Sequence, residues 1–289
     1  MFCLLNTKGQ VASEDVAELA MNLNAEPNKN YFKGKLNNLR IFIKETGEYF
    51  IKGSIWKYET GNNTSSYSYP QFISTCNELD SLTFGTFSQS KVISYEFGLN
   101  IKTNYDPAHY LIPMIGSRNK NRNVSLNPEY KNDEMWIRRS PGLTHGFKCY
   151  NKSLECKMST NMLRIEYCVK SPKRALGKVI GVADLKNTDF VTGQQEIIKS
   201  FSNSLVFHSS YDPSLLTNLK TQDKWRYLAY ANSGINNPRA FLKSMGFNTT
   251  TRSYEYKKLM RIISGPIDHN RMKRELCEKV EKELYTMLP

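Results

Sequence analysis

The sequence predicts an α+β fold, with a central antiparallel sheet, helices packed on its apolar face, an open polar face and a helical C-terminal extension. Three observations predict it. Several segments alternate apolar and polar residues with the period of two that marks a strand with one buried face. Longer segments with helical spacing separate these strands or follow them. From about Leu215 the chain is helical in character and basic.

Length and charge narrow the class of protein. A chain of 289 residues can form one large domain, or a main domain with a smaller one attached. Lys and Arg number 40 and Asp and Glu 27, which gives a net charge of +13 and a pI near 9.3. This balance favours a polyanionic partner, either nucleic acid or an anionic membrane surface, over a soluble protein that is merely basic. From Lys220 onward there are 14 basic and 7 acidic residues, about half of the whole excess.

The lack of a targeting signal and the spacing of the cysteines predict a cytoplasmic protein without a membrane partner. No apolar run approaches the roughly 18 residues of a membrane span, and the first residues lack the pattern of a secretory signal. The six cysteines form no CxxC pair and have no metal-ligand spacing with the four histidines, so reduced thiols are expected.

Five elements are predicted in the first hundred residues from their periodicity. They are a short peripheral helix over 13–24 with Ser13 as N-cap, strands over 39–43 and 49–58, a helix over 69–82 that begins near Pro70, and a strand over 92–101. A turn at Thr46-Gly47 separates the first two strands, and a polar loop covers 59–68.

The second half contains less regular sequence. Residues 103–134 are expected to form a loop or helix insertion, in which the basic run 117–123 is either a nucleic-acid contact or a solvated loop. Pro172 ends a strand, a helix follows over 188–207, and Pro213 marks a boundary. Residues 239–263 have the length and glycine placement of a helix–turn–helix, which an ordinary helical hairpin explains equally well.

Two short strands within 142–169 carry the polar side chains that set the chemistry. In the first strand Tyr150 shares a face with Lys148 and Lys152. In the second, Arg164 and Glu166 lie opposite an apolar face of Leu163, Ile165, Tyr167 and Val169. Laid side by side, the strands present a tyrosine, two lysines, an arginine and a carboxylate together, which suits phosphate chemistry.

A third strand adds a possible metal site. Glu96 lies on the polar face of the strand over 92–101, where Gly98 leaves room for a close approach. Glu96 and Glu166 together could hold a divalent cation, Mg²⁺ or Mn²⁺, with Asn100 adding a neutral oxygen. Such an ion would polarise a phosphodiester.

Tyr150 is the candidate nucleophile on this face. It would form a covalent phosphotyrosine, activated by the metal with Lys148 or Lys152 beside it, while Arg164 clamps the phosphate. The alternative is a solvent-facing cross-strand pair at Tyr150 and an ordinary ion pair between Arg164 and Glu166. Other catalytic signatures, such as HxH, GxSxG, a Walker loop or HExxH, are absent from the sequence.

Five short motifs in order resemble the rolling-circle replication initiators of filamentous-phage type and their plasmid and single-stranded-DNA phage relatives. They are KYETGNN at 57–63, EFGLNI at 96–101, FKCYNKS at 147–153, LRIEY at 163–167 and GVADLKN at 181–187. The resemblance covers roughly residues 34–212, about three fifths of the chain.

The resemblance implies a site-specific DNA endonuclease that nicks and rejoins strands and needs a divalent metal. It implies that Tyr150 attacks the origin strand, that Glu166 and Glu96 belong to an acidic metal site, and that Lys152 and Arg164 bind phosphate. Because the histidine–hydrophobe–histidine motif of the better-known initiators is absent, carboxylates would hold the metal. The product would be a 5′-phosphotyrosine link and a 3′-hydroxyl primer.

The resemblance also implies a domain plan and partners inside a bacterial host cell. Residues 1–33 would be an N-terminal peripheral segment, 34–213 the nicking domain with its active site on the open sheet face, and 214–289 a basic helical DNA-binding segment. The partners would be single- and double-stranded origin DNA, with a host helicase and polymerase. The nucleic-acid-binding residues would be Lys57, Tyr58, Asn62, Lys148, Arg118, Lys120, Arg252, Lys257 and Lys258.

Two alternatives stay open at this point. The chain could be a non-enzymatic, sequence-specific DNA-binding protein, such as a copy-control or transcription factor that uses the helices of 239–263. A mobilisation relaxase would share the chemistry and differ in its DNA and partners.

Overall fold

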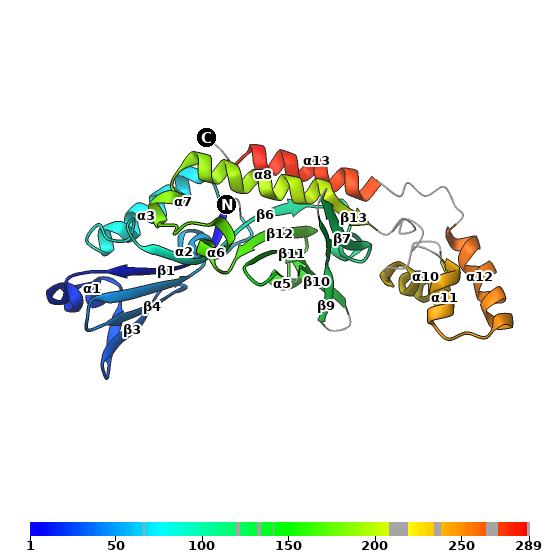
Figure 1. The fold of residues 1–289 in the computed structure, drawn as a ribbon, viewed down its shortest axis with the longest axis horizontal. Helices are drawn as coiled ribbons and strands as arrows, with labels where there is room; N and C mark the ends of the chain where they lie inside the picture. The colour runs from blue at the N-terminus through cyan, green and yellow to red at the C-terminus, as the bar shows by residue number, and fades with distance from the viewer. Residues whose placement is uncertain are drawn as a thin grey trace.

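The computed structural model confirms the α+β fold with one large antiparallel sheet (Figure 1). It describes residues 1–65, 67–119, 122–131, 134–140, 142–207, 219–233, 238–263 and 271–287. Ten strands form the sheet, and every neighbouring pair is antiparallel. Their order across the sheet is β2 (Ala25–Asn28), β3 (Tyr31–Leu36), β4 (Leu39–Lys44), β5 (Glu48–Gly53), β1 (Phe2–Gln10), β6 (Lys91–Lys102), β12 (Met162–Val169), β11 (His145–Asn151), β10 (Glu134–Arg139) and β9 (Asn127–Lys131).

A helical layer covers the apolar face of this sheet. The main helices of this layer are α3 (Tyr69–Leu82), α8 (Thr188–Ser204) and α13 (Arg271–Tyr285), of which α8 and α13 run side by side along the sheet (Figure 1). Tyr95 of β6 donates to Gln194 of α8 at 2.9 Å, and Phe147 of β11 stacks on Phe201 of α8 with ring centroids 3.8 Å apart. The core therefore lies between the sheet and these helices.

Short elements complete the chain. They are the 3₁₀ helix η1 (Ser13–Asp15), helices α1 (Val16–Asn22), α2 (Ile55–Thr60), α4 (Pro107–Leu111), α5 (Lys152–Cys156), α6 (Pro172–Leu176) and α7 (Val182–Leu185), and a second sheet of β13 (Leu205–Phe207), β7 (Met114–Asn119) and β8 (Arg122–Ser125). None of the helices in the described residues is both long and apolar enough to cross a membrane.

Strand alternation fixes which side chains face the open side. In β6 the side chains of Tyr95, Phe97, Leu99 and Ile101 are fully buried in the core, so Glu96, Gly98 and Asn100 point the other way. The predicted strands at 92–101 and within 142–169 are confirmed, as is the helix at 69–82, where Ser68 and Gln71 form a capping box.

Several predicted boundaries are wrong. The strand expected over 49–58 ends at Gly53, because the Ser54 side chain accepts the backbone N–H of Lys57 at 3.1 Å and caps α2. The helix expected over 188–207 ends at Ser204, since 205–207 pair with β7. Ser13 does not cap α1.

The insertion expected over 103–134 as loop or helix is mostly strand. Only α4 is helical there, while β7, β8 and β9 account for most of the other described residues. Its strands are short and their sequences polar, so they lack the alternation that reveals a half-buried strand.

The two ends of the chain meet in the centre of the fold. Residues 2–10, expected in a peripheral segment, form β1 between β5 and β6. Helix α13 packs on α8 and β6, with Leu276, Val280 and Leu284 in the main core.

Helices α10 (Thr221–Asn232), α11 (Pro238–Ser244) and α12 (Thr249–Ile263) share a smaller cluster of Tyr230, Phe241, Leu242 and Leu259. The boundaries at 33 and 213 stay predictions, and Pro213 lies outside the described residues.

Replacement of Leu276 tests the role of α13. Leu276→Ala removes a fully buried side chain from the main core, so it should lower the free energy of unfolding by about 2–5 kcal/mol in urea denaturation. Leu143→Ala makes the same chemical change at a side chain that is 93% exposed and should change it by less than about 0.5 kcal/mol. Equal effects of the two substitutions would show that α13 does not help to form the core.

Candidate active site on the open sheet face

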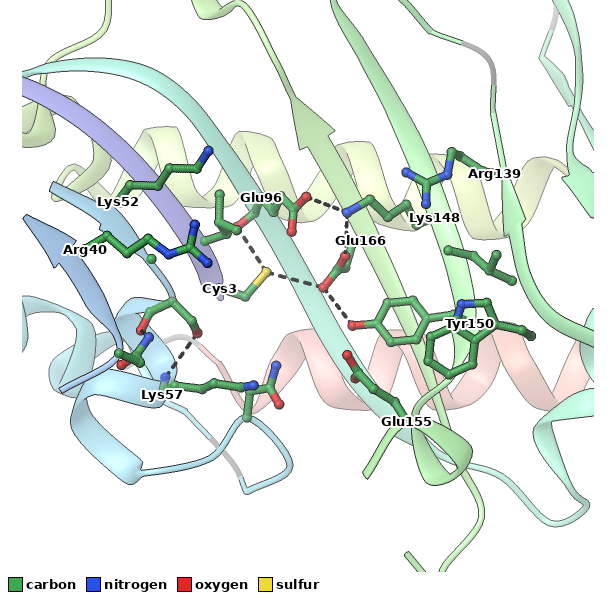
Figure 2. A pocket seen from close by; sticks show the side chains of 17 residues that line it. Cys3, Arg40, Lys52, Lys57, Glu96, Arg139, Lys148, Tyr150, Glu155 and Glu166 are labelled. Carbon is green, nitrogen blue, oxygen red and sulfur yellow. Dashed lines mark hydrogen bonds and ion pairs between the residues drawn. The ribbon is translucent and has the colours of Figure 1, made fainter. Parts of the chain in front are cut away.

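Strand register brings the predicted polar residues into two adjacent rows. Tyr150 on β11 lies opposite Arg164 on β12, which lies opposite Asn100 on β6. In the next row Lys148 lies opposite Glu166, and Glu166 lies opposite Gly98. Residues that pair across antiparallel strands project to the same face, so all of these side chains lie on the open side of the sheet. Figure 2 shows Lys148, Tyr150 and Glu166 there.

Glu166 is the centre of this arrangement. Its carboxylate is buried and accepts hydrogen bonds from Arg164 Nε at 2.6 Å and Tyr150 Oη at 3.1 Å, with Lys148 Nζ at 3.4 Å. Gly98 makes room for it, because a Cβ at that position would lie 2.8 Å from Glu166 Cγ. The predicted glycine gap on the polar face therefore accommodates a protein side chain.

Opposing effects set the protonation of Glu166. Burial alone would raise the pKa of its carboxyl group, but the charges of Arg164 and Lys148 and the hydrogen bonds from Arg164 and Tyr150 outweigh it. The pKa of Glu166 thus lies below its ordinary value, and the group is a carboxylate at neutral pH.

The Tyr150 side chain lies at the floor of the site, and its hydroxyl group donates a hydrogen bond to Glu166. The residue is 7% exposed, and its ring lies 5.8 Å from that of Trp136. Burial raises the pKa of Tyr150; Arg164 partly opposes this effect and Glu166 adds to it. The hydroxyl is therefore a protonated phenol that donates its hydrogen bond to the Glu166 carboxylate, which could take its proton.

Lys148 lies between the two carboxylates. Its ammonium is 2.5 Å from Glu96 Oε1 and 3.4 Å from Glu166 Oε2, and both acids raise its pKa against the effect of burial. Together with Arg164, Lys148 balances the two negative charges of the site.

The residues fit a divalent cation through Glu96 and Glu166. Oxygens of both carboxylates and Cys3 Sγ all lie within 4.8 Å of one another. Two carboxylates suit Mg²⁺ or Mn²⁺, which completes its coordination with water and substrate oxygens. Burial raises the pKa of the Cys3 thiol to about 12, so it is a poor ligand for these hard ions. A bound ion would have to displace Lys148 from the carboxylates.

Three residues predicted for the reaction have other contacts. Asn100, expected as a metal ligand, accepts from Arg164 Nη1 and donates to the backbone oxygen of Asn63, so it fixes the loop after α2. Arg164, expected to clamp phosphate, is fully buried beneath Trp56, with its guanidinium carbon 4.7 Å from that ring centroid. It orients Glu166 and does not line the cleft.

Lys152 is also placed differently from the prediction. It begins α5 instead of extending the strand, and its buried ammonium donates to Asn63 Oδ1 at 2.7 Å and pairs with Glu155. That ammonium lies 5.8 Å from the centre of the Tyr150 ring, so it packs on the ring and does not contact the hydroxyl.

A cleft of about 530 Å³ opens above Tyr150 and the two carboxylates. Four basic residues line it besides Lys148: Arg40 on β4, Lys52 on β5, Lys57 on α2 and Arg139 on β10 (Figure 2). Among the described residues Arg139 pairs with Glu129, while Arg40, Lys52 and Lys57 have no acidic partner. The rim therefore carries positive charge that an anionic ligand would neutralise.

Sequence reasoning found part of this lining. It missed Cys3, Arg40, Lys52, Trp136 and Arg139. Arg40 and Lys52 had a usable signal, since each alternates with buried apolar residues along its strand. Cys3 and Trp136 had none, because only the strand order brings β1 and β10 near the site.

The predicted nucleic-acid contacts do not form one surface. Lys57 and Lys148 line the cleft, but Tyr58 is buried and donates to Glu78 at 2.7 Å. Asn62 accepts backbone N–H groups of its own turn. Arg118 is exposed on β7, Lys120 lies outside the described residues, and Arg252, Lys257 and Lys258 are on α12.

Comparison with known proteins assigns no family. No protein-family model and no curated protein matches the chain. A rolling-circle replication initiator protein from Geobacillus stearothermophilus is similar at 9% identity and a TM-score of 0.36, over 82% of this chain and 98% of that one. The TBP of Methanococcus jannaschii is similar at 14% identity and a TM-score of 0.31, over 64% and 96%. Similarity this distant leaves the function to be argued from the site.

Acid titration tests the state of Glu166. Because its pKa is lower in the folded chain than the value of about 4.3 in an unfolded one, its contribution to stability is present above that pH and is lost as pH falls through the folded pKa. The free energy of unfolding should therefore fall more steeply between about pH 5 and pH 3 in the wild type than in Glu166→Gln. Glu14→Gln, at an exposed position, controls for net charge. An equal dependence of the unfolding free energy on pH in the wild type and in Glu166→Gln would contradict a lowered pKa at Glu166.

Removal of Lys148 tests the cation site. Lys148→Met should tighten Mn²⁺ binding at least about tenfold, because the Lys148 ammonium, 2.5 and 3.4 Å from the two carboxylates, would repel an ion held between them by a few kcal/mol at an effective dielectric of about 20. Titration calorimetry or Mn²⁺ paramagnetic resonance measures this directly. Lys57→Met removes a rim charge that has no carboxylate partner among the described residues and serves as the matched control. An unchanged Mn²⁺ affinity in Lys148→Met would place the ion elsewhere.

Proposed function

We propose that this protein is a DNA strand-nicking and -joining transesterase that initiates rolling-circle replication through Tyr150. The observation that carries the proposal is the Tyr150 hydroxyl, hydrogen-bonded to a buried carboxylate at the floor of a cleft with a basic rim. The five ordered motifs at 57–63, 96–101, 147–153, 163–167 and 181–187 support it from the sequence.

The chemistry follows from the contacts of Tyr150. Its Oη attacks a phosphorus of the bound strand and gives its proton to Glu166, which lies 3.1 Å away. The bond from that phosphorus to the 3′ oxygen of the preceding nucleotide breaks, and this oxygen takes a proton from water. The protein is then joined to the 5′ phosphate, and the free 3′-hydroxyl can prime a host polymerase. Reversal of the same steps with a second strand end rejoins the DNA.

The surrounding residues have separate tasks in this proposal. Arg164 holds Glu166 through Nε, and Lys152 packs on the Tyr150 ring, so both are positioning residues. Arg40, Lys52, Lys57 and Arg139 bind the phosphates of the strand. A divalent cation held by Glu96 and Glu166 would neutralise charge on the phosphoryl oxygens.

A second candidate is a DNA-binding protein without nicking activity. It is favoured by a separate pocket on α11 and α12 of about 390 Å³, which Arg239, Lys243, Arg252 and Tyr256 line. In that case the same helices would bind DNA, and Tyr150 would serve only the fold.

A covalent adduct assay separates the two candidates. The protein is incubated with single-stranded DNA of its own replicon and Mg²⁺ or Mn²⁺, then run on a denaturing gel. Tyr150→Phe should reduce the adduct by at least about a thousandfold, because it removes the attacking oxygen and leaves the ring in place. Tyr130→Phe, at an exposed tyrosine, should not change it.

Two other outcomes of the adduct assay also distinguish between the candidates. An adduct that persists in Tyr150→Phe would retain the transesterase but assign its nucleophile to another tyrosine. The absence of any adduct with either metal, together with salt-sensitive DNA binding, would favour the second candidate.

A further inference from the structure

Three basic side chains lie side by side on the open face next to the cleft. Lys35 of β3 lies opposite Arg40 of β4, which lies opposite Lys52 of β5. The row continues through Asn6 of β1 to Ser94 of β6 and contains no carboxylate. Like charges directly opposite each other destabilise a sheet, so this row costs stability unless an anion neutralises it.

Aromatic rings occupy the neighbouring positions on the same face. The ring centroids of Tyr31 and Phe42 are 4.6 Å apart, and those of Phe42 and Phe50 are 6.0 Å apart. Phe42 and Phe50 pair across β4 and β5 two residues from Arg40 and Lys52, and both remain partly exposed.

Lysines border these rings. The ammonium groups of Lys8 and Lys44 lie 5.7 and 5.8 Å from the centre of Phe50, and their side chains are 44% and 47% exposed. Both lysines also pair with the carboxylate of Glu48 on β5, so their two ammonium groups more than neutralise the acid nearest to these rings.

The opposite face of these strands is already occupied. Leu39, Ile41, Ile43 and Ile51 are buried there in the core cluster, together with Leu19 of α1. The basic and aromatic side chains therefore point away from the core, as the alternation of a strand requires.

The face is continuous with the cleft. Arg40 and Lys52 belong to both, since they line the cavity above Tyr150 (Figure 2). Ser94 at the end of the basic row is two residues from Glu96 on the same face of β6. A polymer that enters the cleft could thus extend over β1, β5, β4 and β3 without a break.

We propose that this open face of β1, β3, β4 and β5 binds the single-stranded segment of DNA that flanks the phosphodiester in the cleft. Lys35, Arg40 and Lys52 contact its phosphates, and Phe42 and Phe50 stack on its bases. Positive charge beside accessible aromatic rings is the combination that binds single strands, because unpaired bases offer their faces for stacking and a duplex does not. The assignment of this segment as the flank of the nicked site rests on the proposed function; the binding itself does not.

Anisotropy titration of a labelled single-stranded oligonucleotide tests the proposal. Phe50→Leu should weaken binding about 5- to 150-fold, the range that one lost base stack gives, and should leave duplex affinity unchanged. Lys52→Gln should weaken binding and reduce the slope of log affinity against log salt by about 0.7, one phosphate contact on a single strand. Lys282→Gln, on α13 of the helical layer, makes the same charge change and should leave both quantities as in the wild type.

The outcomes separate this proposal from the nicking reaction. Thermal unfolding first confirms that each variant is folded, and Arg40→Gln replaces any variant that is not. Wild-type single-strand affinity in the face variants overturns the proposal even if the Tyr150 adduct forms. Weakened single-strand binding without any adduct in the wild type supports the face and refutes the transesterase. Equal losses for single strands and duplex also overturn the proposal, because they would reflect charge alone.

Discussion

The candidate site depends on one buried carboxylate, that of Glu166. A charge away from water is tolerated only when it is paired and hydrogen-bonded, and Arg164, Tyr150 and Lys148 together meet that need. Burial of this carboxylate also places requirements on the residues around it. Gly98 must lack a side chain, Asn100 must hold the guanidinium of Arg164, and the loop after α2 must close over both. The site is thus tied to the central strands more than to any loop.

The same buried network limits what the tyrosine can do by itself. Burial makes Tyr150 a weaker acid, and neither Lys148 nor Lys152 contacts its hydroxyl among the described residues. The group that can receive its proton is the carboxylate that also holds Arg164. The hydrogen-bond acceptor of Tyr150 and the partner of Arg164 are therefore one side chain, so a substitution of Glu166 alters both contacts.

Strand periodicity explains why much of this could be predicted from the sequence. The rule of alternate faces places Glu96, Tyr150, Arg164 and Glu166 on one side without knowledge of the fold, and the structure agrees. Periodicity does not supply the order of strands, so the contributions of Cys3 and Trp136 stayed hidden. Periodicity also cannot show how deeply a side chain is buried. The sequence predicted Arg164 and Tyr58 as accessible functional groups. In the structure both are buried, Arg164 beneath Trp56 and Tyr58 in contact with Glu78.

The position of β1 has a consequence for how the chain folds. This strand, residues 2–10, has as its neighbours β5 and β6, which follow some forty to ninety residues later, and α13 at 271–285 packs against β6. Contacts between distant parts of a sequence close late and slow the folding of a sheet. On the ribosome the core face of β6 therefore stays partly uncovered until α13 has emerged, so the strands that carry the cleft reach their final packing only when this last helix docks.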